Sequence, residues 1–188
     1  MTDNEIGYAV LNWWKDLTGR QNDSDGVLKK TNSGRTAERA ELKRCKSPEH
    51  IIGLKGYHRL RSYIADDSIN PEALAVIAGV CSHIREHDSL NEFPLLLAKA
   101  VQGKITPPLS EGRFKKLVTS RTSTEFYTGL RRALQLINNT GNILSLTKGI
   151  LLWYRAKSNP VINVQDSMLF QWSKDYYDQL LKNENKNN

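Results

Sequence analysis

Apolar residues recur at helical spacing along most of the chain, and no segment shows the strict alternation of a half-buried strand. The first stripe predicts an amphipathic helix behind a cap at Asp3 or Asn4, ending at Gly19. Its apolar face comprises Ile6, Val10, Trp13, Trp14 and Leu17. These residues are therefore expected in the core.

A capping residue followed by proline predicts the start of two later helices, at Ser47-Pro48 and at Asn70-Pro71. The second of them carries an apolar stripe through Ala73, Ile77, Val80, Cys81 and Ile84. A further apolar face is expected from Leu90, Phe93, Leu97, Ala100 and Val101, with Gly103 as its C-cap.

The segment from Leu109 to Ile137 mixes apolar and basic positions most densely and predicts two helices joined by a short turn. The first follows a cap at Ser110 and buries Phe114, Leu117 and Val118. The second follows Thr122 or Ser123 and buries Phe126, Leu130, Ala133, Leu134 and Ile137. The bases of both helices occupy the remaining faces.

Two helices complete the chain. Asn142 is a cap for a segment that is apolar almost all round, and the last helix has its apolar arc at Met168, Leu169, Trp172, Tyr176 and Leu180. The pattern predicts an all-α fold of two packed helical bundles with no sheet. The break at Gly103 to Pro108 divides it into residues 1–105 and residues 106–188.

The net charge of +7 is distributed unevenly. Residues 29–62 hold ten bases and three acids, and residues 99–132 hold eight bases and two acids. Residues 63–98 between them hold one base and six acids. In the first basic block a helical stripe joins Arg35, Arg39, Lys43 and Lys46. Segregated positive charge of this kind favours a polyanionic partner, because neutralising phosphates releases counterions.

Catalytic and metal-binding patterns are weak. His83 and His87 have the i, i+4 spacing of two zinc ligands but lack an identifiable third, so two histidines at the surface or at the rim of the core are the favoured interpretation. The carboxylates show neither a glycosidase pair nor a two-metal cluster, and no nucleophile-elbow, dinucleotide or P-loop motif occurs. We therefore expect a binding protein without catalytic residues, metal or other cofactor.

The remaining composition indicates a cytoplasmic protein. No apolar run is long enough to span a bilayer, and the N-terminus has no basic region or cleavage site of a secretory signal. Cys45 and Cys81 are expected to be reduced. The tryptophans fall on core stripes, which favours backbone recognition by arginine and lysine over stacking of bases on aromatic rings.

In order and spacing, several segments together resemble the CasB family, the small helical subunit of the type I-E CRISPR complex Cascade. The resemblance spans most of the chain and is carried by Trp13-Trp14, RTAERAELKRC (Arg35 to Cys45), LSEGRFKKLV (Leu109 to Val118), LRRALQLI (Leu130 to Ile137), NILSLTKGILLW (Asn142 to Trp153) and QWSKDYY (Gln171 to Tyr177).

The resemblance implies a non-enzymatic, two-bundle subunit for antiviral defence that binds RNA and DNA backbone. It would lie as a head-to-tail pair with a second copy of itself, beside the backbone subunits and the large subunit. Its basic face would stabilise the R-loop that forms when guide RNA invades target DNA. Pairing with the guide reads the sequence, so the protein needs only positive charge on rigid helices.

The resemblance transfers this role to eight basic residues, and the charge of the central block adds Arg121. The candidate nucleic-acid-binding residues are Arg35, Arg39, Lys43, Arg44, Arg113, Lys116, Arg121, Arg131 and Arg132.

Two other functions stay open. The helices that meet at Ser120 to Ser123 could form a helix-turn-helix DNA-binding regulator. Its second helix, however, starts with Thr124, Glu125 and Thr128, and its arginines come later. A magnesium-dependent nuclease is the third alternative.

Overall fold

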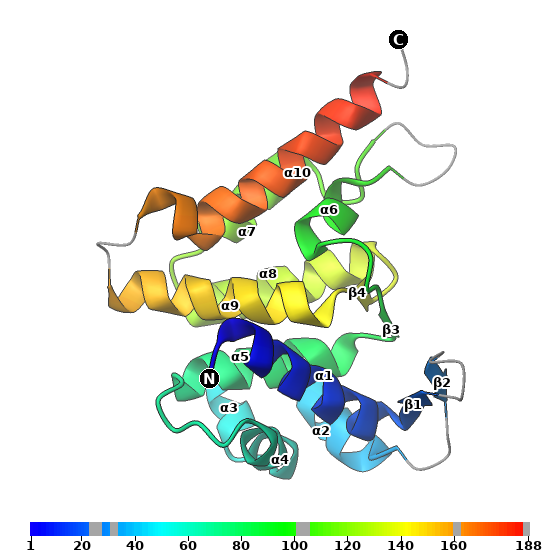
Figure 1. Ribbon diagram of the computed structural model, residues 1–188, viewed down its shortest axis with the longest axis vertical. Coiled ribbons are helices and arrows are strands. Elements are labelled where there is room, and N and C mark those ends of the chain that lie inside the picture. The colour runs from blue at the N-terminus through cyan, green and yellow to red at the C-terminus, as the bar shows by residue number, and fades with distance from the viewer. Residues whose placement is uncertain (23–27, 31–33, 101–105, 160–162, 186–188) are drawn as a thin grey trace.

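The computed structural model describes residues 1–22, 28–30, 34–100, 106–159 and 163–185, and these residues are predominantly helical (Figure 1). In chain order the elements are α1 (Asp3–Thr18), β1 (Arg20–Asn22), β2 (Leu28–Lys30), α2 (Thr36–Arg44), α3 (Pro48–Ile52), α4 (Lys55–Ile64), α5 (Pro71–His83), β3 (Glu86–His87), α6 (Phe93–Ala98), α7 (Glu111–Val118), α8 (Ser123–Leu136), β4 (Thr140–Gly141), α9 (Ile143–Ser158), the 3-10 helix η1 (Val164–Asp166) and α10 (Met168–Asn185). The expectation of a helical protein is confirmed.

The expected absence of any sheet was wrong, because two short strand pairs occur. β1 pairs antiparallel with β2, with Arg20 opposite Lys30, and β3 pairs parallel with β4, with Glu86 opposite Thr140. The sequence between β1 and β2 contains Asp25-Gly26, which is a hairpin signal. Strands of two residues, such as β3 and β4, are too short for periodicity to reveal them.

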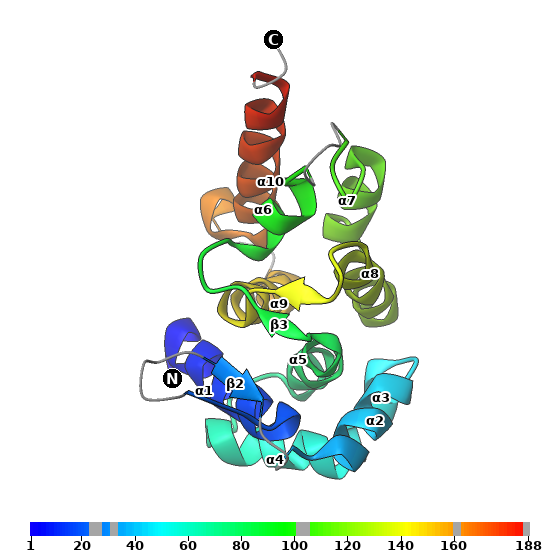
Figure 2. The same ribbon diagram turned by 90° about the vertical axis from the view of Figure 1, so that its right-hand side faces the viewer.

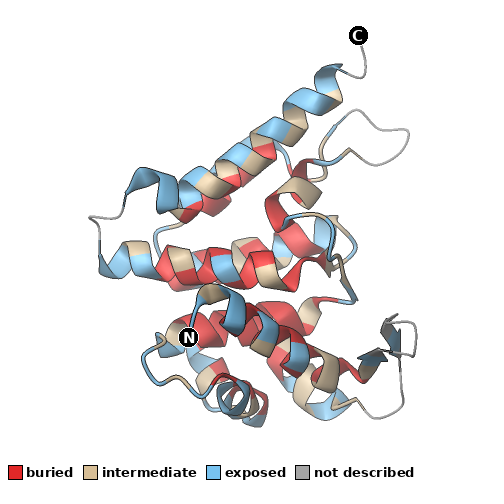
Figure 3. Cartoon of the chain, viewed as in Figure 1, coloured by how far each residue is buried: buried red, intermediate tan, exposed pale blue. Residues whose placement is uncertain are grey.

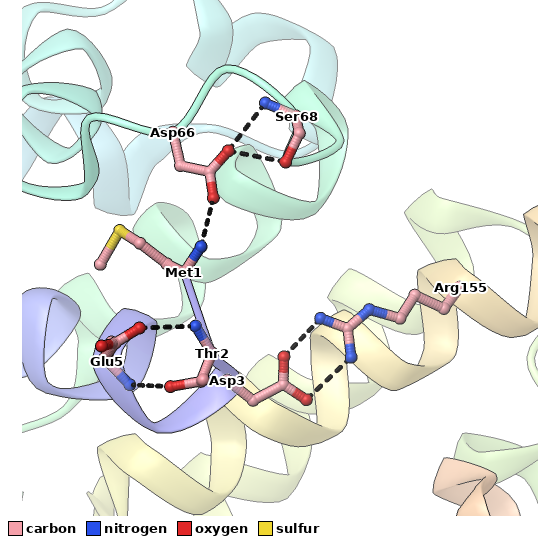
Figure 4. Close-up of polar contacts among 7 residues, drawn as sticks. All are labelled: Met1, Thr2, Asp3, Glu5, Asp66, Ser68 and Arg155. Carbon is pink, nitrogen blue, oxygen red and sulfur yellow. Dashed lines mark hydrogen bonds and ion pairs between the residues drawn. The ribbon is translucent and has the colours of Figure 1, made fainter.

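The start of α1 is fixed by a capping box (Figure 4). The Thr2 hydroxyl accepts a hydrogen bond from the Glu5 backbone N–H, and the Glu5 carboxylate accepts one from the Thr2 N–H. Thr2 is thus the N-cap, in place of the expected Asp3 or Asn4. At the other end Gly19 adopts the left-handed conformation expected of a C-cap.

Two polar contacts tie this end of α1 to other parts of the chain (Figure 4). The Met1 amino group lies 2.9 Å from the carboxylate of Asp66, whose pKa falls to about 2 because Ser68 and then the amino group hydrogen-bond to it. Arg155 of α9 forms a bidentate ion pair with Asp3. The first turn of α1 is therefore fastened both to the loop before α5 and to α9.

The helices stack in layers from α1–α5 at one end to α6, α7 and α10 at the other, with α8 and α9 between them (Figures 1 and 2). α1 packs along α9, and α5 contacts α2, α3, α4, α8 and α9. Buried residues line the inward faces of these helices (Figure 3) and belong to one continuous core. Helices from both ends of the chain thus contribute to the same core.

The division into two bundles is not resolved by this packing. α6 precedes the proposed boundary at 105/106, yet it packs against α10 and α9. Val101 and Gly103, which were assigned to the end of this helix, lie outside the described residues. The two-bundle boundaries remain a prediction.

Most predicted core positions are buried, and the clearest exceptions are Leu90 and Leu169. All five apolar residues of the first stripe are at most 1% exposed. Leu90 was expected in the core but is 91% exposed, because it precedes α6 in a turn closed by Asp88. Leu169 is 48% exposed although Met168, Trp172 and Tyr176 of the same helix are buried. The helix predicted from Ser47 is divided into α3 and α4 after Ile52.

Aromatic residues form much of the core between α7, α8, α9 and α10. Phe114 stacks on Tyr176 at 3.9 Å between ring centroids, and Phe126 stacks on Trp153 at 4.5 Å. Trp172 lies against Gly149, where a Cβ atom would stand only 2.2 Å from the indole ring. This contact is possible only because residue 149 has no side chain.

Candidate nucleic-acid interface

Arg35 stands immediately before α2 and is engaged with α1. Its Nε donates to the Asp16 carboxylate at 2.8 Å, and its backbone N–H donates to the Leu17 carbonyl. The Arg35 side chain is 38% exposed. The arginine therefore holds the beginning of α2 against the last turn of α1. Its positive charge is compensated by Asp16 and is less available to a phosphate.

Arg39 fastens α2 to the end of α5. Its Nε donates to the Ser82 carbonyl at 2.9 Å, and its Nη2 donates to the Ile84 carbonyl at 2.7 Å. The last carbonyls of a helix have no partner within the helix, so a cation there is favourable. Burial, and then the nearby charges of Arg20 and Arg85, lower the pKa of Arg39.

Arg131 fastens α8 to the end of α2 in the same way. It extends from α8 and donates to the Cys45 carbonyl at 2.9 Å and to the Lys43 carbonyl at 3.3 Å, with its guanidinium over the Tyr127 ring. The Tyr127 hydroxyl donates to the same Cys45 carbonyl. Arg131 and Arg39 thus link α8 to α2 and α2 to α5.

The junction of α2, α5 and α8 concentrates positive charge. Burial, and then Arg39 and Arg85, lower the pKa of Lys43. Burial lowers the pKa of His83 to about 4, and Arg131, Lys43 and Arg39 add to the effect. These groups therefore lie close enough to feel one another's positive charge.

The depressed pKa of His83 predicts a pH-dependent stability. As pH falls below about 6.5 the histidine of the unfolded chain takes up a proton, whereas the folded one stays neutral down to about pH 4. His83 therefore contributes stability above pH 6.5 that is lost as pH falls towards 4. Urea denaturation at pH 7 and pH 5 should show a smaller loss for His83→Gln than for the wild type. The exposed His58→Gln should keep the wild-type loss, and equal losses in all three proteins would contradict the prediction.

Four other candidates are exposed on or beside α7 and α8. They are Arg113, Lys116, Arg121 and Arg132, and within the described residues their side chains form no hydrogen bond or ion pair. The opposite face of α7 buries Phe114, Leu117 and Val118, which forces its bases outward. Arg44 of α2 is also exposed, and its Nε donates to the Ala40 carbonyl in its own helix.

The three helices that carry most of the candidate residues adjoin one another. α7 packs on α8, and Arg131 of α8 reaches the end of α2. Figure 2 shows α7, α8 and α2 along one side of the molecule. The junction brings together Arg39, Lys43 and Arg131. The adjoining α7–α8 region carries Arg113, Lys116, Arg121 and Arg132. Arg35, at the start of α2, forms an ion pair with Asp16 instead.

Arg20 and Arg85 also contribute charge at the junction, although the sequence analysis did not select them. Both act on Arg39 electrostatically, and Arg20 lies over the Trp14 ring while its guanidinium pairs with Glu86. Arg85 is the one base of the acidic block between residues 63 and 98. The net negative charge of that block hides the contribution of Arg85, and the sequence does not show that Arg85 lies near α2 in space.

The described part of the chain contains no cluster of three or more histidine, cysteine or acidic residues that could hold an ion. His87 uses its Nδ1 to accept a hydrogen bond from the Ile143 backbone N–H at 3.3 Å. Among the described helices, none is both long and apolar enough to cross a membrane.

Comparison with known proteins identifies the family. The family model for CRISPR-associated protein Cse2 matches residues 38–177, which include every candidate residue except Arg35. Neither the curated proteins nor the solved structures gave a significant match. Since the matched segment covers about three quarters of the sequence, the chain belongs to the CRISPR-associated Cse2 family, also called CasB, the small subunits of the multi-subunit type I-E Cascade complex.

Proposed function

We propose that this Cascade subunit is non-catalytic and holds nucleic-acid backbone on the side formed by α2, α7 and α8, so that it stabilises the R-loop. The observation that supports this function is the set of exposed bases on α7 and α8 that have no partner among the residues that the structure describes. Unpaired cations on rigid helices can neutralise phosphates and release counterions without paying to break an existing ion pair.

Eight of the nine candidate residues divide into two roles under this proposal, while Arg35 is paired with Asp16. Arg113, Lys116, Arg121 and Arg132, with Lys43 and Arg44, contact phosphates. Arg39 and Arg131 contribute positive charge, but their donors are directed at helix carbonyls, so they act mainly as positioning residues. The subunit works in the cytoplasm with guide RNA and target DNA, and the head-to-tail arrangement with a second copy remains part of the proposal.

The helix-turn-helix alternative is disfavoured by the beginning of α8. The Glu125 carboxylate accepts hydrogen bonds from the backbone N–H groups of Arg121 and Thr122 and completes a capping box. A side chain occupied in this way is not available to read base edges, which is the task of this position in a recognition helix.

Removing three of the unpaired bases tests the function. In the reconstituted complex, Arg113→Gln, Lys116→Gln and Arg132→Gln together should shorten the lifetime of the R-loop. The slope of log K against log salt is negative, and it should become shallower by about 2 to 3, since each lost phosphate contact reduces its magnitude by about 0.7 to 0.9.

A matched control removes three exposed lysines from α4 and α10, through Lys55→Gln, Lys174→Gln and Lys182→Gln. This variant has the same net charge as the first. If both variants lose affinity equally, binding reflects only the overall charge and the proposed interface is wrong.

A further inference from the structure

A cleft of about 610 Å³ opens between α1, the segment from β3 to α6, α9 and α10. None of its lining residues comes from α2, α7 or α8, so it is separate from the proposed nucleic-acid interface. Its volume is within the range of cavities that enclose a ligand or a long side chain. Nothing in the proposed binding of nucleic acid uses it.

The floor of the cleft is apolar. Leu11 is 8% exposed and Trp172 is 3% exposed, and the indole is held against Gly149 of α9. At the rim Tyr8 is 59% exposed, and the half-buried Leu144 also lines the cleft. An aliphatic stem could therefore lie on this floor while an aromatic face remains open to a cation.

The polar wall carries two carboxylates, Glu92 before α6 and Asp175 on α10. Within the described residues, neither of these carboxylates accepts a hydrogen bond or joins an ion pair. Burial, and then repulsion from Glu92, raise the pKa of Asp175, although Lys174, and then Lys148, which also lines the cleft, partly offset this. Two acids that repel each other at the edge of an apolar floor are stabilised by an incoming cation.

The combination of an apolar floor, an exposed tyrosine and two unpaired carboxylates fits an arginine side chain. Its planar guanidinium can pair with carboxylates and stack on an aromatic ring, while its stem covers apolar surface. The same acids repel phosphate, which disfavours nucleic acid here. Because the chain belongs to a multi-subunit complex, a neighbouring protein can supply the arginine.

We propose that the cleft between α1, α9 and α10 is a docking site for an arginine-bearing segment of a different Cascade subunit, held by Glu92 and Asp175 over the floor of Leu11 and Trp172. This inference rests on membership of the complex and not on the nucleic-acid interface.

The first arm of the test removes the two charges. Glu92→Gln with Asp175→Asn should weaken incorporation of the subunit into the reconstituted complex by at least about tenfold in Kd, as expected when a desolvated charge pair loses one side. Glu41→Gln with Asp166→Asn removes two exposed acids elsewhere and should leave incorporation within about twofold of the wild type.

The second arm identifies the occupant. A photo-crosslinking amino acid, p-benzoylphenylalanine, replaces Tyr8 at the rim, and the crosslinked peptides from the reconstituted complex are sequenced by mass spectrometry. The proposal expects a peptide of another protein subunit with an arginine within a few residues of the adduct. A crosslink to nucleic acid or to a second copy of this chain, or no crosslink, would overturn the proposal. Incorporation of the Glu92→Gln/Asp175→Asn variant at the wild-type level would overturn it as well.

Two further measurements separate this outcome from loss of folding or of nucleic-acid binding. The Glu92→Gln/Asp175→Asn variant should unfold at the wild-type temperature or above, because it removes a repulsive pair. The salt dependence of nucleic-acid binding by the isolated chain should be unchanged. A lower unfolding temperature would show that the acids stabilise the fold, and the proposal would then fail.

Discussion

Replacing Gly149 with alanine is expected to lower the free energy of unfolding by about 2 kcal/mol or more, because the new methyl group would occupy the place of the Trp172 ring. The indole cannot retreat easily, since it packs between Phe93 and Phe126. The gain in helix propensity from glycine to alanine, about 1 kcal/mol, is smaller than the usual upper range of overpacking costs.

Urea denaturation of Gly149→Ala measures this effect, with Gly112→Ala as the control. Gly112 lies in α7 with no heavy atom within 4 Å of the position of a Cβ, so its replacement should be neutral or stabilising. Shortening the ring by Trp172→Phe in the Gly149→Ala background should recover part of the loss, and a double-mutant cycle would give the coupling. Equal stability of Gly149→Ala and the wild type would contradict the close contact.

Arg131→Gln is expected to destabilise the protein by about 2 kcal/mol, whereas Arg132→Gln should change stability by no more than about 0.5 kcal/mol. Arg131 donates to the carbonyls of Lys43 and Cys45, which would lose a charged partner at the end of α2. Arg132 is exposed. Both substitutions remove one positive charge from neighbouring positions, so they control for each other.

Nucleic-acid binding should rank the same two variants in the opposite order. Arg132→Gln should reduce the salt dependence of binding by the share of one phosphate contact, while Arg131→Gln should act mainly through stability. Arg131→Lys should recover part of the lost stability, because a lysine keeps the charge but not the forked donors. If Arg131→Gln is as stable as Arg132→Gln, the carbonyl contacts do not hold α8 on α2.

Several helix ends could be predicted because their chemistry is local. Asn70, Thr122 and Asn142 accept hydrogen bonds from backbone N–H groups at the beginning of α5, α8 and α9, as their positions before apolar stripes indicated. Each cap involves residues two or three apart in the sequence. The sequence therefore contains both partners within one short window.

The roles of the basic residues could be predicted only in part. Their segregation into two blocks, and the outward direction of the bases on α7, follow from composition and helical periodicity. The acceptors of Arg39 and Arg131, in contrast, are carbonyls 43 to 88 positions away along the chain. Nothing near either arginine in the sequence distinguishes a guanidinium that caps a distant helix from one that faces solvent.

The sequence by itself determined the helical class, the buried faces of α1, α5 and α8, and the location of positive charge along the chain, since each depends on spacing within a few turns. Only the tertiary structure decided which arginines hold helices together, how β3 pairs with β4, and that Glu92 and Asp175 share a cleft. These features depend on which distant segments pack side by side, and packing is set by the shape of the whole core rather than by any one stretch.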